Sequence, residues 1–174
     1  MRTLKKRILA VALTAMAAAT MAMPSFADWH IEADDNTGRY LNIAGTLGSS
    51  PNKRYLSLYR TSAPNSDQTF VLMKKSGTSK DNYVLCSTQN TLYAMNRTSG
   101  GRAWMWNLQN NGYNDSRLKT PTSDSAGVLV SYYYGNIGYS GSNIYFGSGT
   151  SNWFVSGTPT LPLNSNSVAT NPYI

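Results

Sequence analysis

Three stretches of this chain repeat one pattern, in which an apolar residue and a Tyr are followed by a polar turn and then by an aromatic residue. They are SLYRTSAPNSDQTF (57–70), TLYAMNRTSGGRAW (91–104) and the shorter NIYFGSGTSNW (143–153). Three leucines add to the pattern, because Leu41, Leu85 and Leu129 are spaced by 44 residues. Units of about this spacing are each too small to bury a hydrophobic core of their own. They are therefore predicted to pack around a shared pseudo-threefold axis and close a barrel, which leaves no long strand edge exposed.

The sequence between these units also predicts an all-β protein. Apolar residues come in short runs, bounded by clusters of Gly, Ser, Asn, Asp and Pro, which is the signal of strands and turns. No segment after residue 27 predicts a helix. Many short strands in one domain favour a closed architecture, and the irregular third unit leaves a β-sandwich as the alternative. The expected strands are 29–33, 39–44, 54–60, 69–75, 83–87, 91–97, 103–109, 116–120, 127–134, 143–147 and 152–157.

The first 27 residues predict a secretory signal peptide. MRTLKKR is basic, residues 8–23 are apolar, and the segment ends in Ser25-Phe26-Ala27, a small-x-small site. The apolar run is shorter than the roughly 20 residues that span a bilayer. We expect cleavage after Ala27, a secreted product of bacterial type, and no membrane span in the mature chain. A retained membrane anchor is the alternative interpretation.

The charge of residues 28–174 does not call for a nucleic-acid partner. Four of the 15 Lys and Arg residues lie in the leader, whereas all 8 acidic residues lie after it, so the net charge falls from +7 to +3. The basic residues that remain are scattered along the chain. The single cysteine, Cys86, excludes an internal disulfide and sits in an apolar run, where we expect a buried thiol.

The sequence predicts no enzyme, no cofactor and no metal site. General acid–base chemistry usually needs a positioned His or a carboxylate pair, and the chain has one His, His30. Its only acidic cluster, Glu32 with Asp34 and Asp35, is interpreted as a strand that leads into a turn. No second Cys or His provides the spacing of a zinc site.

The repeats resemble those of the ricin-type β-trefoil lectin family. DQTF (67–70) matches the late Gln-x-Trp motif with Phe in place of Trp, while RAW (102–104) and SNW (151–153) keep only the Trp. The resemblance implies a β-trefoil over 28–158, with repeats of about 28–73, 74–118 and 119–158. Residues 159–174 would form a C-terminal tail.

The resemblance also implies where a sugar would bind. In this family each repeat uses a polar residue of an early strand, an aromatic residue of the mid-repeat pair, and the polar residue before the Gln. In the first repeat these are Asn42, Tyr59 and Asp67, supported by Gln68. The corresponding residues of the later repeats are weaker candidates: Ser87, Tyr93 and Gly101 in the second, and Ser131, Tyr145, Ser151 and Asn152 in the third.

The expected function is that of a secreted, non-catalytic protein that binds glycans or glycoconjugates. The alternative is a secreted protein-binding factor, such as an inhibitor, an adhesin or a toxin subunit, on the same scaffold. It rests on residues 131–154, an uncharged segment of Tyr, Gly, Ser and Asn, which is the composition that binding loops favour.

Overall fold

The computed structural model describes residues 28–47, 54–77, 81–120, 129–147, 153–157 and 168–174. Its first seven strands are β1 (Trp29–Ala33), β2 (Arg39–Ile43), β3 (Leu56–Arg60), β4 (Phe70–Lys74), β5 (Tyr83–Ser87), β6 (Tyr93–Arg97) and β7 (Ala103–Asn107). The last four are β8 (Val130–Ser131), β9 (Gly135–Ser140), β10 (Asn143–Phe146) and β11 (Trp153–Gly157). The helices in this part of the chain are the 3-10 helix η2 (Ser66–Gln68), the π-helix η3 (Leu108–Gly112) and α2 (Tyr113–Ser116). The prediction of an all-β fold is confirmed.

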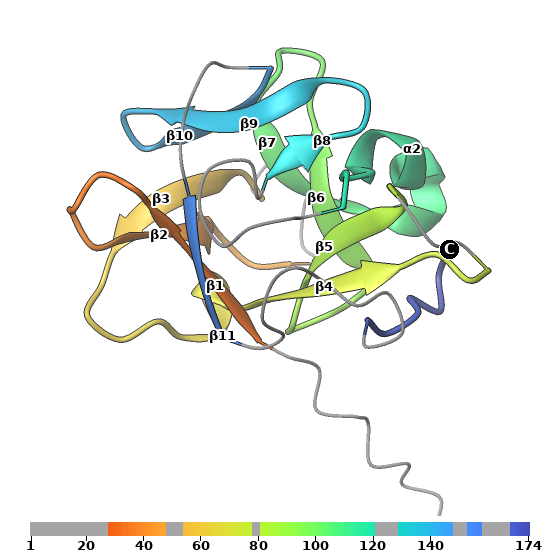
Figure 1. The fold of residues 1–174 in the computed structure, drawn as a ribbon, viewed down its shortest axis with the longest axis horizontal. Helices are drawn as coiled ribbons and strands as arrows, with labels where there is room; N and C mark the ends of the chain where they lie inside the picture. Colours follow the sequence, from red (N-terminus) through yellow and green to blue (C-terminus); the bar gives the residue numbers. More distant parts are fainter. Residues whose placement is uncertain (1–27, 48–53, 78–80, 121–128, 148–152, 158–167) are drawn as a thin grey trace, which may run out of the picture.

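The strands form one antiparallel sheet that curls around the core (Figure 1). Its order is β7-β6-β5-β4-β1-β2-β3-β10-β9-β8, and β11 pairs with β1. Strand β1 pairs with three others: with β11 along its length, with β4 at Trp29 and with β2 at Glu32. This branching lets strands from both ends of the chain share one core.

Three hairpins, β2–β3, β6–β7 and β9–β10, are joined to one another in pairs. Single bridges link the second strand of each hairpin to a neighbour: Tyr55 to Trp104, Arg102 to Tyr145 and Asn143 to Ser57. A backbone hydrogen bond of 2.9 Å lies beside each bridge. The donors and acceptors are Leu58 N to Ser142 O, Met105 N to Arg54 O, and Phe146 N to Gly101 O.

Alternation along the strands sends one set of side chains into a common core. Strand β1 alternates buried and half-buried residues, so that Trp29, Ile31 and Ala33 face inward. Phe70 and Trp153 are also fully buried and add large apolar surfaces, each providing about 1.5–3 kcal/mol of burial free energy or more. Further core residues come from the hairpins, such as Leu41 and Met105, and from β4 and β5, such as Leu72 and Leu85.

Strands β4 and β5 are buried on both faces, because a second, smaller cluster lies behind them. It consists of Val71, Met73, Val84, Cys86, Ala94 and Leu108, with Tyr113, Ala169 and Ile174 packed against it. Burial raises the pKa of the Cys86 thiol to about 12. The thiol is thus a neutral packing group, as expected from its apolar surroundings.

The described part of the C-terminal segment, residues 168–174, closes this second cluster. Thr170 forms a parallel bridge with Lys74, and the Asn171 N–H donates to the Lys74 carbonyl at 2.9 Å. The fully buried Asn171 amide donates to the Thr91 carbonyl at 2.9 Å and lies 3.3 Å from the Cys86 sulfur. The segment therefore belongs to the fold.

Three local features differ from the sequence prediction. Residues 132–134, expected as part of a strand, form a turn, and β9 (Gly135–Ser140) was not among the expected strands. Residues 116–120 were expected to form a strand, but Ser116 ends α2 and only Leu118 forms bridges. The segment before it, expected to be a turn, is the π-helix and α2. Gly112 permits this, since a Cβ there would lie 2.6 Å from Trp106 Cδ1 and 2.8 Å from the Asn107 carbonyl.

The repeated apolar-Tyr pairs also occupy different strands. Tyr59 and Tyr145 lie on β3 and β10, the second strands of their hairpins, whereas Tyr93 begins β6, a first strand. Eleven residues after Tyr59 the chain reaches Phe70 on β4, outside the β2–β3 hairpin. Eleven residues after Tyr93 it reaches Trp104 on β7, which is still in the β6–β7 hairpin. Residue spacing did not distinguish the two strands of a hairpin, because both carry the same alternation.

We predict that Asn171→Ala lowers the free energy of unfolding by about 1–3 kcal/mol, since it removes the hydrogen bonds that the buried amide makes with the Thr91 carbonyl and the Tyr173 N–H. The change should also make Cys86 reactive with a thiol reagent under native conditions. Chemical denaturation and thiol labelling measure the two effects. Asn114→Ala, on an exposed amide, is the control; equal behaviour of the two variants would show that the C-terminal segment does not cover the thiol.

Candidate functional site

Four residues predicted from the first repeat line one open pocket of about 310 Å3. Asn42 comes from β2, Tyr59 from β3, and Asp67 and Gln68 from η2. The remaining lining residues are Ile43, Ala44, Gly45 and Asn65. The β2–β3 hairpin and the turn that follows it thus converge on one surface, and the volume lies at the lower end of the range for small-molecule sites.

The Gln68 side chain links two residues that line the pocket, Asn42 and Asn65. It is buried, its carbonyl accepts from the Asn65 backbone N–H at 3.0 Å, and its amide donates to the Asn42 side-chain oxygen. Asn65 completes a capping box, because its own side chain accepts from the Asp67 N–H at 2.8 Å. With both ends of its amide in use, Gln68 is a positioning residue.

Asp67 presents a carboxylate to the pocket. One carboxylate oxygen accepts from the Gln89 amide at 2.8 Å, and the same amide donates to the Ser66 carbonyl at 3.1 Å. Among the described residues no hydrogen bond is made by the other carboxylate oxygen. That oxygen is an acceptor of fixed position, ready for a hydroxyl donor.

Tyr59 forms an aromatic wall of the same pocket. Its side chain is 56% exposed, and it faces Tyr40 across the β2–β3 ladder. The Asn42 amide donates to the Ser57 hydroxyl at 3.1 Å, and its second N–H bonds to no other residue that the structure describes. An exposed ring beside a carboxylate and an amide suits a ligand that has an apolar face and hydroxyl groups at its edge.

The candidates from the second repeat lie apart from any such arrangement. Tyr93 is buried, with the guanidinium carbon of Arg54 4.5 Å from its ring centre. Ser87 is fully buried and Gly101 is buried at the end of a turn, with a φ of 84°. None of the three presents a side chain to solvent.

The third repeat is described only in part. Ser131 is buried, and its hydroxyl accepts from the Tyr134 N–H at 3.2 Å. Tyr145 is half-buried on β10, opposite Gly138. Ser151 and Asn152 lie outside the described residues.

Sequence reasoning missed a tryptophan pair on β7. Trp104 and Trp106 stack with ring centres 4.5 Å apart and planes inclined by 16°. Asn96 faces Trp104 across the hairpin, as Asn42 faces Ser57 in the first one. Its buried amide is already occupied, since it donates to the Gly112 carbonyl at 2.8 Å and to the Ser116 hydroxyl at 3.0 Å. The Trp-x-Trp alternation was the available signal, but it was interpreted only as a strand.

Two of the residues weighed for catalysis, His30 and Asp35, make local contacts with other side chains. His30 lies on β1, with its Nε2 3.2 Å from the Thr69 hydroxyl. Asp35 pairs with Arg39 and Thr37; burial opposes its ionisation, but these hydrogen bonds outweigh burial and lower the pKa of Asp35. In the described part of the chain no three His, Cys, Asp or Glu residues are grouped to hold a metal ion. The same residues include no helix with the length and apolar character to cross a membrane.

A scan of protein-family models found none that matches this chain, and searches of curated proteins and of solved structures found no similar protein. The site is therefore interpreted from its own chemistry.

We predict that Gln68→Ala destabilises the fold by about 1–3 kcal/mol, because it leaves the Asn65 N–H and the Asn42 oxygen without partners. Gln89→Ala, which removes an exposed amide beside the same pocket, should change stability by no more than about 0.5 kcal/mol. Urea denaturation of both variants measures the difference. If the two variants lost the same free energy, Gln68 would not hold the pocket.

Proposed function

We propose that this protein is a secreted, non-catalytic carbohydrate-binding protein with a β-trefoil architecture. The observation that carries the proposal is the convergence of Asn42, Tyr59 and Asp67 on one pocket, with Gln68 fixed behind them. The signal-peptide pattern of residues 1–27 supports secretion.

The joined hairpins support the trefoil part of the proposal. Each of the three bonds between hairpins has its acceptor one or two residues before a second strand, at Arg54, Gly101 or Ser142. In each hairpin the donor lies four residues after that acceptor, at Leu58, Met105 or Phe146. A pseudo-threefold arrangement of three hairpins accounts for this regularity, and a β-sandwich would not require it.

The pocket chemistry fits one sugar ring. Tyr59 would stack on the apolar C–H face, while the free carboxylate oxygen of Asp67 and the remaining N–H of Asn42 bond two hydroxyls. A hexose has about 12 heavy atoms, and about 0.3 kcal/mol per atom gives about 3.6 kcal/mol, or a dissociation constant of about 2 mM. We therefore expect weak binding of single rings and detection through multivalent display.

One observation favours a second candidate, a protein-binding factor. Tyr132 and Tyr133 are 41% and 53% exposed, and Arg117 lies over both rings, at 3.9 Å and 5.5 Å from their centres. The same arginine donates to the Tyr133 hydroxyl at 3.2 Å. Exposed tyrosines held in place by an arginine are typical of protein interfaces, where Tyr and Arg often contribute most of the binding energy. They belong to the segment 131–154, which was predicted to contact a partner.

We predict that residues 28–174 bind a subset of a glycan array, and that Tyr59→Ala weakens binding by about tenfold or more, a loss of about 1.4 kcal/mol. Asp67→Ala should act in the same direction, because it removes the free acceptor. Tyr133→Ala removes a similarly exposed ring outside the pocket and is the matched control.

Binding lost in both pocket variants and kept in the control would support the proposal. Binding that all three variants retain would contradict the assignment of the site. A folded protein that leaves the array silent, but captures a protein through Tyr132 and Tyr133, would favour the second candidate.

A further inference from the structure

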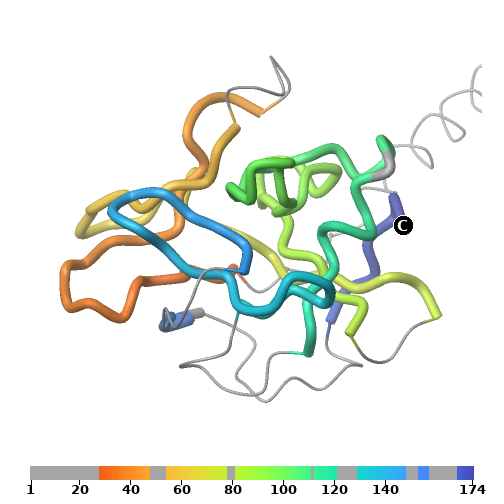
Figure 2. Tube along the Cα trace, turned by 90° about the horizontal axis from the view of Figure 1, so that it is seen from above, coloured from red at the N-terminus to blue at the C-terminus, as the bar shows by residue number. Residues whose placement is uncertain are grey.

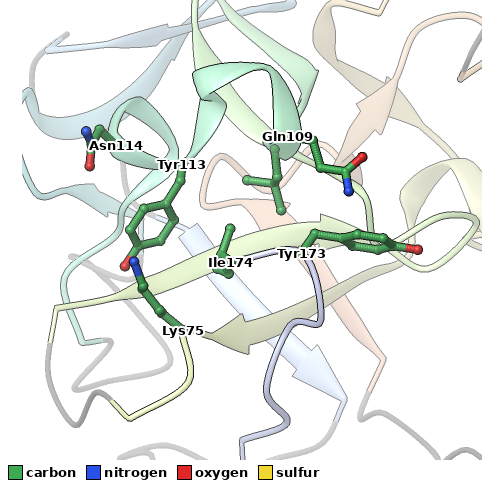
Figure 3. A pocket seen from close by; sticks show the side chains of 7 residues that line it. Lys75, Gln109, Tyr113, Asn114, Tyr173 and Ile174 are labelled. Carbon is green, nitrogen blue, oxygen red and sulfur yellow. The ribbon is translucent and has the colours of Figure 1, made fainter.

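The C-terminal segment completes a second pocket, away from the first. Its volume is about 430 Å3, and it is lined by Lys75, Leu108, Gln109, Tyr113, Tyr173 and Ile174, with Asn114 at its edge. Figure 3 shows Tyr113 and Tyr173 on either side of Ile174, with the Gln109 amide next to the Tyr173 ring. Two aromatic rings, an apolar floor of Leu108 and Ile174, and an amide and an ammonium group therefore share one concave surface.

The Tyr173 side of this pocket is held by a buried amide. The side-chain oxygen of Asn171 accepts from the Tyr173 N–H at 2.9 Å, while its nitrogen donates to the Thr91 carbonyl at 2.9 Å. Asn171 is fully buried, yet Tyr173 remains 39% exposed. A strongly anchored turn that presents an exposed ring to a pocket is a preorganised wall, and preorganisation reduces the cost of binding.

The opposite side is fixed just as firmly. The Tyr113 hydroxyl donates to the Asn82 side chain at 2.9 Å, and the Lys75 ammonium nitrogen lies 4.8 Å from the centre of its ring. Burial raises the pKa of Tyr113 above its ordinary value, so the ring stays neutral. On the floor, the Gln109 N–H is capped by the Asn107 side chain at 2.9 Å, which sets the position of the π-helix.

We propose that this pocket is a second carbohydrate-binding site, which takes one pyranose ring of a glycan. The Tyr173 ring stacks on the apolar face of the sugar, Gln109 bonds a hydroxyl through its exposed amide, and Lys75 donates to an oxygen at the rim. The proposal goes beyond the first pocket and does not need it, because none of these residues belongs to that pocket.

With two binding sites, one copy of the protein could hold two glycan chains. The β2–β3 hairpin and the C-terminal segment lie at opposite ends of the molecule in both views (Figures 1 and 2). Because the two pockets share no lining residue, both can be occupied at once, and a single copy of the protein would then cross-link a branched or polymeric ligand.

The experiment is a titration of isotope-labelled residues 28–174, followed through the backbone amide resonances. Galactose, glucose, mannose, N-acetylglucosamine and N-acetylgalactosamine are added one at a time. We expect at least one of them to shift Gln109, Tyr113 and Ile174 as a group. Tyr173→Ala should weaken that response by about tenfold, and Tyr173→Phe, which keeps the ring, should restore it.

This experiment tests the second site and the first site independently. Shifts at Gln109 and Ile174 that survive in Tyr59→Ala support the second site, whether or not Asn42 and Asp67 respond. Shifts confined to Asn42, Tyr59 and Asp67 overturn the second site and leave the proposed function standing. A response at Gln109 that Tyr173→Ala does not change also overturns it, as does a well-dispersed spectrum that no sugar alters near Ile174.

Discussion

Three backbone hydrogen bonds between hairpins are the constraint on which the rest of this structure depends. Leu58, Met105 and Phe146 each donate to the neighbouring hairpin at 2.9 Å, so the three hairpins hold one another. With a single cysteine in the chain, no disulfide can take over this role. Closure by backbone pairing satisfies strand edges that would otherwise promote aggregation, and it fixes the β2–β3 hairpin that lines the first pocket.

Hydrogen bonds from buried side-chain amides are the second stabilising feature, and they connect the sheet to its loops. Gln68 ties η2 to Asn42, Asn96 ties the helical segment to β6, and Asn171 ties the C-terminal segment to β5. Each has partners at both ends, as a buried amide must. The loops that carry Asp67 and Tyr173 are therefore held by specific bonds, and these are the loops that line the candidate sites.

The alternation of apolar residues was sufficient to predict an all-β chain, since it requires one buried face per strand. The meeting of Asn42, Tyr59 and Asp67 came from the family resemblance, because nothing in the spacing alone brings β2 and η2 together. The positions of Tyr93 and Trp106 could not be predicted, since the two strands of a hairpin share one alternation pattern. The helical turn at 108–116 depends on Gly112 fitting against Trp106, and the second pocket depends on Asn171. Both are tertiary contacts with no local signature.

Native-state hydrogen exchange of the Leu58, Met105 and Phe146 amides tests most directly whether closure by the hairpins organises the fold. If it does, all three amides should be among the slowest to exchange and should open with one common free energy, equal to that of global unfolding. One amide that exchanged at a much lower free energy than the other two would contradict the account. It would mean that its hairpin opens alone, and that the sheet and its pockets do not depend on a closed set of three.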